Sequence, residues 1–219
     1  MRQMTSNSPL ICLASASPRR RELLNQMGVP HRIMAAHIDE AVRAWEGPRD
    51  YVIRMAQDKA VAVRERGERL PVLAADTSVV LDDVIFGKPV DREDFMSMLG
   101  KLSGRTHDVL TSVALATDGG VHVLVSTSEV RFRSLAEAEI EKYWETGEPR
   151  DKAGGYAVQG FGAVFIEWLS GSYSGVMGLP IFETAELLAD AGIPCWGAVG
   201  GPKPATDDGP TSGSGPRRP

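Results

Sequence analysis

The chain has 219 residues, of which 42% are hydrophobic and 24% are charged, and its formal net charge is −5. This composition is typical of a globular protein, and the length suits one large or two small domains. No segment approaches the roughly eighteen apolar residues of a membrane span, and the N-terminus lacks the apolar core of a signal peptide, so we expect a cytoplasmic protein. The acidic balance argues against a broad nucleic-acid-binding surface.

The cysteine content excludes two further classes of protein. The two cysteines, Cys12 and Cys195, fit a reduced compartment better than a disulfide scaffold. Neither has the spacing of a metal ligand, so we expect no thiol chemistry.

The first half of the chain alternates predicted strands and helices. Apolar runs predict strands, and apolar residues at helical spacing predict helices. In chain order we expect a strand at 9–14, a helix from Pro18 to Met27, a strand at 31–35, a helix at 48–66, a strand at 71–75, and a small hairpin of 79–81 and 84–86 with Asp82 and Asp83 at its tip. This alternation predicts a mostly α/β sheet with helices packed against it.

The second half predicts a long hairpin between helices. We expect a helix from the cap Asp91 to Leu102 with Asp94 in its first turn, strands at 107–117 and 121–133 joined across Asp118-Gly119-Gly120, a helix opened by a capping box at Ser134 to Glu137, a strand within 160–169, and a helix at 179–191. From residue 197 the composition predicts a disordered tail. We therefore expect one domain over 8–195, arranged as two lobes.

The segment Ser15-Ala16-Ser17-Pro18-Arg19-Arg20 joins the first strand to the first helix. Pro18 favours the first helical position, with Ser17 as the expected cap. The helix amides and the arginines would then suit phosphate oxygens. A capped helix with solvated arginines explains the same residues equally well.

Asp76 directly follows the apolar run 72–75, so we expect its carboxylate at the carboxyl end of a buried strand. There it could hold Mg²⁺ or activate a water beside a polyphosphate. The alternative is a turn aspartate that caps its own backbone.

Three other charged residues are ambiguous taken one by one. Lys88, in Gly87-Lys88-Pro89, and Lys59 each suit a phosphate or a solvated surface. Glu40 suits either a site or a loop cap.

Small residues bracket Lys152 and Gln159 in the segment 151–160. An amide side chain offers donors and an acceptor to a base edge, but a plain glycine loop explains the pattern as well. In the segment 103–107, His107 has no second histidine at ligand spacing, which favours a structural role.

Six segments form one ordered pattern over about residues 9 to 193. They are Ser15-Ala-Ser-Pro-Arg-Arg, Ala75-Asp-Thr, Gly87-Lys-Pro, Ser103-Gly-Arg-Thr-His, Asp151-Lys-Ala-Gly-Gly-Tyr-Ala-Val-Gln-Gly and Val176-Met-Gly-Leu-Pro. This pattern resembles the Maf family. The chain departs from it at Ala157 and Val158, which replace the more usual Gly and Ile before the glutamine.

The resemblance implies a metal-dependent nucleoside triphosphate pyrophosphatase that cuts the α–β bond. It implies a mixed, twisted central sheet flanked by helices, with two lobes around a cleft, similar to the fold of inosine-triphosphate pyrophosphatases. It also implies Mg²⁺ or Mn²⁺ as the cofactor and suggests a homodimer.

The resemblance further assigns roles to individual residues. Asp76 is expected as the proton acceptor, with Lys59 and Lys88 beside it, and as a metal ligand together with Glu40. The residues expected to bind the substrate are Ser15, Ser17, Arg20 and Lys152. Positive charge on the phosphoryl oxygens and a base for the attacking water are what this reaction needs.

Three positions distinguish branches of the family, and here they are Arg19, Thr77 and Gln159. This set resembles the branch that prefers dTTP and UTP, whereas the branch that hydrolyses 7-methyl-GTP tends to carry Trp, Gln and Glu. Gln159 would pair a donor and an acceptor of a uracil or thymine ring. The competing hypothesis is a nucleotide-binding regulator of cell division, an inhibitor of septum formation with little turnover, which would not need Asp76.

Overall fold

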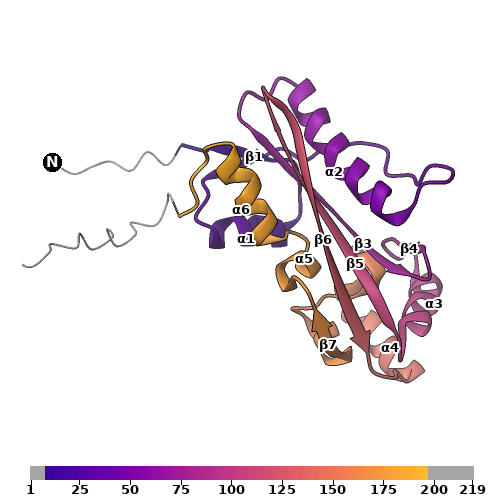
Figure 1. Cartoon of the computed structure of the whole chain (residues 1–219). Helices are drawn as coiled ribbons and strands as arrows, with labels where there is room; N and C mark the ends of the chain where they lie inside the picture. The colour runs from indigo at the N-terminus through magenta and orange to yellow at the C-terminus, as the bar shows by residue number, and fades with distance from the viewer. Residues whose placement is uncertain (1–7, 197–219) are drawn as a thin grey trace, which may run out of the picture.

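The computed structural model describes residues 8–196, and the expected disordered tail lies outside this range. A seven-stranded mixed sheet has the order β2-β1-β3-β5-β6-β7, with β4 paired to β3 (Figure 1). The strands are β1 (Ile11–Leu13), β2 (His31–Ile33), β3 (Val72–Leu81), β4 (Val84–Phe86), β5 (Thr106–Thr117), β6 (Gly120–Phe132) and β7 (Ile166–Ser170). β1 pairs parallel with β2 and β3, and the other pairs are antiparallel. The expected mixed sheet is confirmed.

Helices cover both faces of this sheet, with α2 on the opposite side from α1 and α6 (Figure 1). The α-helices are α1 (Pro18–Gln26), α2 (Pro48–Glu65), α3 (Arg92–Leu102), α4 (Glu137–Glu145), α5 (Tyr173–Met177) and α6 (Ile181–Asp190). The 3-10 helices are η1 (Glu148–Asp151), η2 (Ala153–Gly155) and η3 (Phe161–Phe165). Within residues 8–196, no helix combines the length and the apolarity that a membrane crossing needs.

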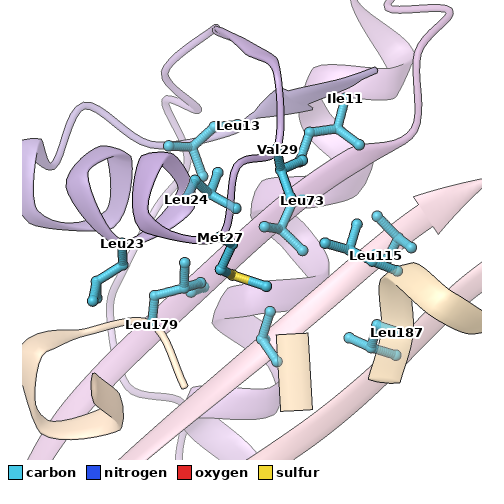
Figure 2. Packing of buried hydrophobic residues seen from close by; sticks show 13 residues of the cluster. Ile11, Leu13, Leu23, Leu24, Met27, Val29, Leu73, Leu115, Leu179 and Leu187 are labelled. Atoms are coloured by element: carbon cyan, nitrogen blue, oxygen red, sulfur yellow. The ribbon is translucent and has the colours of Figure 1, made fainter. Parts of the chain in front are cut away.

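The alternation of side chains along the strands divides the interior into cores on the two faces. Odd-numbered residues of β1, β3 and β5 pack against α1 and α6 in what we call the α1 core (Figure 2). Even-numbered residues of the same strands pack against α2 in the α2 core. The parity of a residue on β3 therefore decides which helices its side chain meets.

The α2 core is built almost entirely from small side chains. Ala56 and Ala60 of α2 face Ala74 of β3 and Ala114 of β5, and all four are fully buried. Alanines on both sides allow a helix to lie close to a sheet. This close approach brings the polar residues of α2 within reach of β3.

A third cluster, the α3 core, joins α3 and α4 to the far ends of β3, β5 and β6. Val79 and Leu81 of β3 belong to it, whereas Leu73 belongs to the α1 core. Thr77 and Thr111 lie between these two cores as a directly opposed cross-strand pair. The expected arrangement as two lobes around a cleft stays a prediction.

β3 differs from the strands expected at 71–75 and 79–81, because it runs without interruption from Val72 to Leu81. Its pairing with β5 is continuous from Val72 to Val80, and this pairing keeps the intervening polar residues extended. On its other edge β1 pairs only with Val72 and Leu73, and β4 only with 79–81. The edge of β3 between these partners is open.

Two local predictions in the second half were wrong. The expected strand at 160–169 begins only at Ile166, because the Glu148 carboxylate accepts bonds from the backbone of residues 161 and 162 and these residues form η3. The expected cap Ser134 is not a cap, since Leu135 N donates to Ser103 Oγ at 2.8 Å and keeps the chain extended. α4 starts at Glu137 instead, and Glu139 accepts from Ala136 N at 3.1 Å.

Two other local predictions are confirmed. Asp91 caps α3, accepting a bond from Asp94 N at 2.8 Å. Asp82 and Asp83 form the tip of the β3–β4 hairpin with φ of 51° and 61°. Aspartate tolerates this left-handed backbone better than most residues, so the tip needs no glycine.

Replacing Ala60 with Leu tests the close approach of α2 to the sheet. The added methyl groups have no space between fully buried alanines, so we expect a loss of about 1–3 kcal/mol in unfolding free energy from overpacking. Urea unfolding measures this loss, and Val61→Leu on the exposed side of the same helix is the control. Equal stability of the Ala60→Leu variant and the wild type would contradict the tight packing.

Candidate functional site

A cavity of about 660 Å³ opens at the free edge of β3. It is lined by residues from the loop after β1, the start of α1, the loop before α2, α2 itself, β3, the loop after β4 and the segment 151–159. Every site residue expected from the sequence lines it: Ser15, Ser17, Arg19, Arg20, Glu40, Lys59, Asp76, Thr77, Lys88, Lys152 and Gln159. The fold therefore gathers these distant segments in one place.

The strand directions explain why the segments converge. β1 runs parallel to β3 and ends beside Leu73, so Ser15 follows where the open edge begins. β4 runs antiparallel to β3 from the other end and stops beside Val79, so Lys88 follows at the opposite limit of the opening. Both strands therefore deliver their carboxyl ends to the same gap.

The sequence predicted Asp76 at the carboxyl end of a strand. The structure instead places it inside β3. Its side chain, on the even face, meets α2, where Lys59 Nζ donates to Asp76 Oδ1 at 2.7 Å. The same Nζ lies 2.8 Å from Glu40 Oε1. The Lys59 and Asp76 side chains are each 10% exposed and that of Glu40 is 51% exposed, so two carboxylates converge on one nearly buried ammonium group.

Tyr51 of α2 holds the loop that carries Glu40. Its hydroxyl donates to the Glu40 carbonyl oxygen at 2.9 Å. Burial, followed by the charges of Asp76 and Glu40, raises the pKa of Tyr51 to about 12, so the hydroxyl remains a donor. Burial raises the pKa of Glu40, but the hydrogen bond and the charge of Lys59 outweigh this and lower it overall.

The odd face of the open edge carries a second polar group, centred on Arg20. Its Nε donates to the Gly178 carbonyl oxygen at 2.7 Å, and its Nη1 and Nη2 lie 3.3 Å from Ser15 Oγ and 3.4 Å from Thr77 Oγ1. Thr111 lies beneath, with its Oγ1 3.1 Å from Thr77 Oγ1. Burial lowers the pKa of Arg20, while the charge of Asp76 opposes this effect. The guanidinium is thus held in one orientation at the cavity wall.

The start of α1 corrects one expectation. Ser17 occupies the cap position, but its side chain makes no capping hydrogen bond. Instead Ser17 N donates to Ser15 Oγ at 3.2 Å. The turn after β1 is therefore stabilised by Ser15, and Ser17 lines the cavity without capping the helix.

Arg19 is the residue with unused hydrogen-bonding capacity. Its Nε is buried and has no hydrogen-bond partner in the described part of the chain. Burial lowers the pKa of the guanidinium, and the charges of Asp151 and Glu148 oppose this. A buried donor without a partner is costly, which suits a residue that bonds to a ligand.

The remaining predicted residues differ in how firmly they are held. Lys152 donates to the Glu148 carbonyl oxygen at 3.0 Å and pairs with the Asp151 carboxylate. Lys88 and Gln159 are exposed at the cavity rim. These two side chains are free to reach a ligand.

His107 lies in the core, as the absence of ligand spacing suggested. Its Nε2 lies 2.8 Å from the Tyr156 hydroxyl, and its ring packs edge-on against Phe132 with centroids 4.9 Å apart. Burial lowers the pKa of His107 to about 4, so the ring is neutral at neutral pH. Tyr156 lines the cavity, and His107 contacts it from the core.

The carboxylates of Asp76 and Glu40 suit a divalent metal ion that the substrate helps to coordinate. No group of three or more His, Cys, Asp or Glu residues that could hold a metal occurs within 8–196. Asp76 and Glu40 nevertheless approach one common point, as their shared contact with Lys59 demonstrates. Mg²⁺ typically takes one or two protein carboxylates and completes its shell with water and phosphate oxygens.

Three contributors to the site were missed by the sequence analysis. Tyr51 and Thr111 belong to segments that were interpreted only as helix and strand, and no local pattern marks them. Gly178 stands in the motif from Val176 to Pro180, but no role was assigned to it. Its carbonyl oxygen fixes Arg20.

The sequence matches known proteins over most of its length. The family model described as Maf-like protein matches residues 10–191. A dTTP/UTP pyrophosphatase of Hahella chejuensis is 51% identical over 189 residues, covering 85% of this chain and 94% of the relative. A dTTP/UTP pyrophosphatase of Alkalilimnicola ehrlichii is 56% identical over 186 residues, covering 82% of this chain and 92% of the relative.

The Ham1 protein of Staphylococcus aureus is a structural neighbour with a TM-score of 0.39 and 15% identity, covering 71% of this chain and 79% of that one. This likeness is too low to carry an argument about fold, and the expected similarity to inosine-triphosphate pyrophosphatases stays a prediction. The match of the family model and the long alignments with these relatives show that the chain belongs to the Maf family.

Proposed function

We propose that this protein is a pyrophosphatase that hydrolyses dTTP and UTP to the nucleoside monophosphate and pyrophosphate. The observation that carries the proposal is the Asp76–Lys59–Glu40 group at the open edge of β3, with Arg20 on the other face of the same strand. It places a base, a cation and phosphate-binding donors around one cavity. The names of the relatives, which are about half identical to this chain, support the substrate assignment.

Asp76 is the group that accepts the proton of the attacking water. Lys59 binds its Oδ1, which leaves the second carboxylate oxygen to face the water. The Lys59 ammonium also offsets the negative charge that gathers when a triphosphate enters beside two carboxylates. A positioned general base contributes roughly 10²–10⁴-fold in rate.

Arg20, Ser15 and Lys88 bind the phosphates. The Gly178 carbonyl oxygen orients Arg20 before the substrate binds, so little side-chain entropy is lost on binding. Lys88 lies exposed on the loop after β4 and suits the leaving pyrophosphate, whose charge increases as the α–β bond breaks. Ser17 and Lys152 complete the binding of the triphosphate.

We also propose a Mg²⁺ or Mn²⁺ ion held by Asp76 and Glu40. When bound, it would neutralise phosphate oxygens and orient the substrate. The residues of the chain supply the base and the phosphate donors independently of the ion.

Arg19, Thr77 and Gln159 select the nucleotide. Gln159 offers a donor and an acceptor to the edge of uracil or thymine, and Arg19 has a buried donor free for the substrate. Thr77 acts through Arg20, because its hydroxyl already accepts from that guanidinium.

The regulator hypothesis is not favoured, since the reported relatives are named for catalysis. A single domain over 8–195, a homodimer, a cytoplasmic location and the absence of a nucleic-acid partner remain proposals that rest on the sequence and the resemblance.

Replacing Asp76 with Asn tests the general base. The amide cannot accept the proton, so we expect kcat for dTTP to fall about 10²–10⁴-fold while dTTP still binds. Pyrophosphate release and calorimetric binding measure the two effects. Asp83→Asn, at the exposed hairpin tip outside the cavity, is the control. A wild-type rate in the Asp76→Asn variant means that the catalytic assignment is wrong.

A panel of nucleoside triphosphates tests the substrate and the metal. We expect pyrophosphate release from dTTP and UTP to exceed that from 7-methyl-GTP, and chelation by EDTA to abolish it until Mg²⁺ or Mn²⁺ is restored. Faster hydrolysis of 7-methyl-GTP contradicts the assignment to the dTTP/UTP branch. Binding of dTTP without turnover in either metal supports the regulator instead.

A further inference from the structure

The loop 156–160, which carries Gln159, is fastened through its backbone to a tyrosine outside it. Ala157 N donates to the Tyr143 hydroxyl oxygen at 3.2 Å. That hydroxyl in turn donates to Glu148 Oε1 at 2.7 Å. The backbone on the N-terminal side of Gln159 is therefore tied to a pair of side chains from α4 and η1.

The same pair also holds the backbone on the C-terminal side of Gln159. Phe161 N donates to Glu148 Oε2 at 3.0 Å, and Gly162 N donates to Glu148 Oε1 at 3.1 Å. A Cβ added at Gly160 would overlap Glu148 Oε2, so the backbone rests directly on the carboxylate. The segment that presents Gln159 is thus clamped at both ends by Tyr143 and Glu148.

Neither side chain of this clamp lines the cavity. Tyr143 is 4% exposed, and its ring packs against Phe165 and Phe95 with centroids 5.1 and 6.0 Å away. Burial and then the hydrogen bond to Glu148 raise the pKa of Tyr143. For Glu148, burial raises the pKa, but the Tyr143 hydroxyl and the two backbone amides lower it overall. The clamp is a neutral donor and an ionised acceptor, anchored in the α3 core.

Glu148 also connects the other residues of this side of the cavity. Its carbonyl oxygen accepts from Lys152 Nζ at 3.0 Å. Its carboxylate is one of the negative charges that act on the Arg19 guanidinium. Glu148 therefore binds the backbone beside Gln159 and the ammonium group of Lys152, and its charge acts on the guanidinium of Arg19.

We propose that Tyr143 and Glu148 are positioning residues that set the distance and orientation of Gln159 toward the pyrimidine base. The proposal rests on the proposed function, because it assumes that Gln159 pairs with uracil or thymine. Hydrogen-bonded discrimination requires that the amide be held where the base edge arrives. Inside the loop, Gly160 N donates to the Ala157 carbonyl oxygen at 3.3 Å, and the bonds to the clamp hold the backbone on both sides of this turn.

The variants Glu148→Gln and Tyr143→Phe test the clamp. The amide of Glu148→Gln presents a donor where a backbone N–H needs an acceptor, and Tyr143→Phe removes the hydroxyl that links the two halves. We expect the ratio of kcat/KM for UTP to that for ATP to fall about tenfold or more in each, mainly through a higher KM for UTP. A loss of folded protein would lower the apparent kcat/KM for UTP and for ATP equally and leave their ratio unchanged.

Two matched controls come from the same chain. Glu145→Gln changes an exposed carboxylate of α4, and Tyr173→Phe changes an exposed tyrosine of α5, and neither residue lines the cavity. Both should keep the wild-type ratio. An unchanged ratio in folded Glu148→Gln and Tyr143→Phe overturns the proposal.

A double-mutant cycle shows whether the clamp acts through Gln159. In the Gln159→Ala background, Glu148→Gln should change the UTP-to-ATP ratio less than about twofold, because the group that it positions is gone. Independent, multiplying effects of the two substitutions overturn the proposal.

Hydrogen exchange separates the clamp from the proposed function, because it needs no substrate. The amides of Ala157, Phe161 and Gly162 should lose protection in Glu148→Gln but not in Glu145→Gln, and unchanged protection overturns the clamp. Absence of pyrophosphate release in the wild type would instead refute the proposed function, and the role in base recognition with it.

Discussion

The open edge of β3 is the constraint on which the site depends. β5 pairs with β3 along nearly its whole length, whereas β1 and β4 cover only its two ends on the other side. An exposed strand edge normally invites pairing with another chain. Here Asp76, Thr77 and Ser78 in the gap are polar, and the loops that leave β1 and β4 bring to it Ser15 and Lys88, which we propose bind phosphate. The break in the sheet is therefore the place where the protein can admit a ligand.

Neighbouring residues on this edge perform different tasks because they point to opposite faces. Asp76 faces α2 and forms the ion group with Lys59, and Thr77 faces α1 and supports Arg20. Bringing Asp76 and Lys59 out of water is costly, and their contact at 2.7 Å offsets that cost. The small residues of the α2 core make this contact possible, because they let the helix lie against the sheet. The packing of α2 and the proposed catalytic contact thus depend on the same surface of this helix.

In the proposed mechanism, the reaction and the choice of base depend on different parts of the molecule. Asp76 and Lys59, the proposed catalytic residues, lie on β3 and α2, whereas the loop that carries Gln159 is bonded to Tyr143 and Glu148. Under this proposal, substitutions in that loop change which nucleotide is accepted without moving Asp76. The α1 core and the α3 core meet at Thr77 and Thr111, whose hydroxyl groups form a pair between them.

The sequence alone determined the order of most elements and the cap at Asp91, because apolar periodicity and turn chemistry are local properties. The motifs that resemble the Maf family pointed to site residues that all line the cavity. The sequence misplaced Asp76 at a strand end, since only the pairing with β5 carries β3 through that polar residue. It missed Thr111 and Tyr51, whose roles come from partners far along the chain. Tertiary structure alone decided which helices cover each face of β3 and where its edge is open, because both depend on contacts between segments that are distant in the sequence.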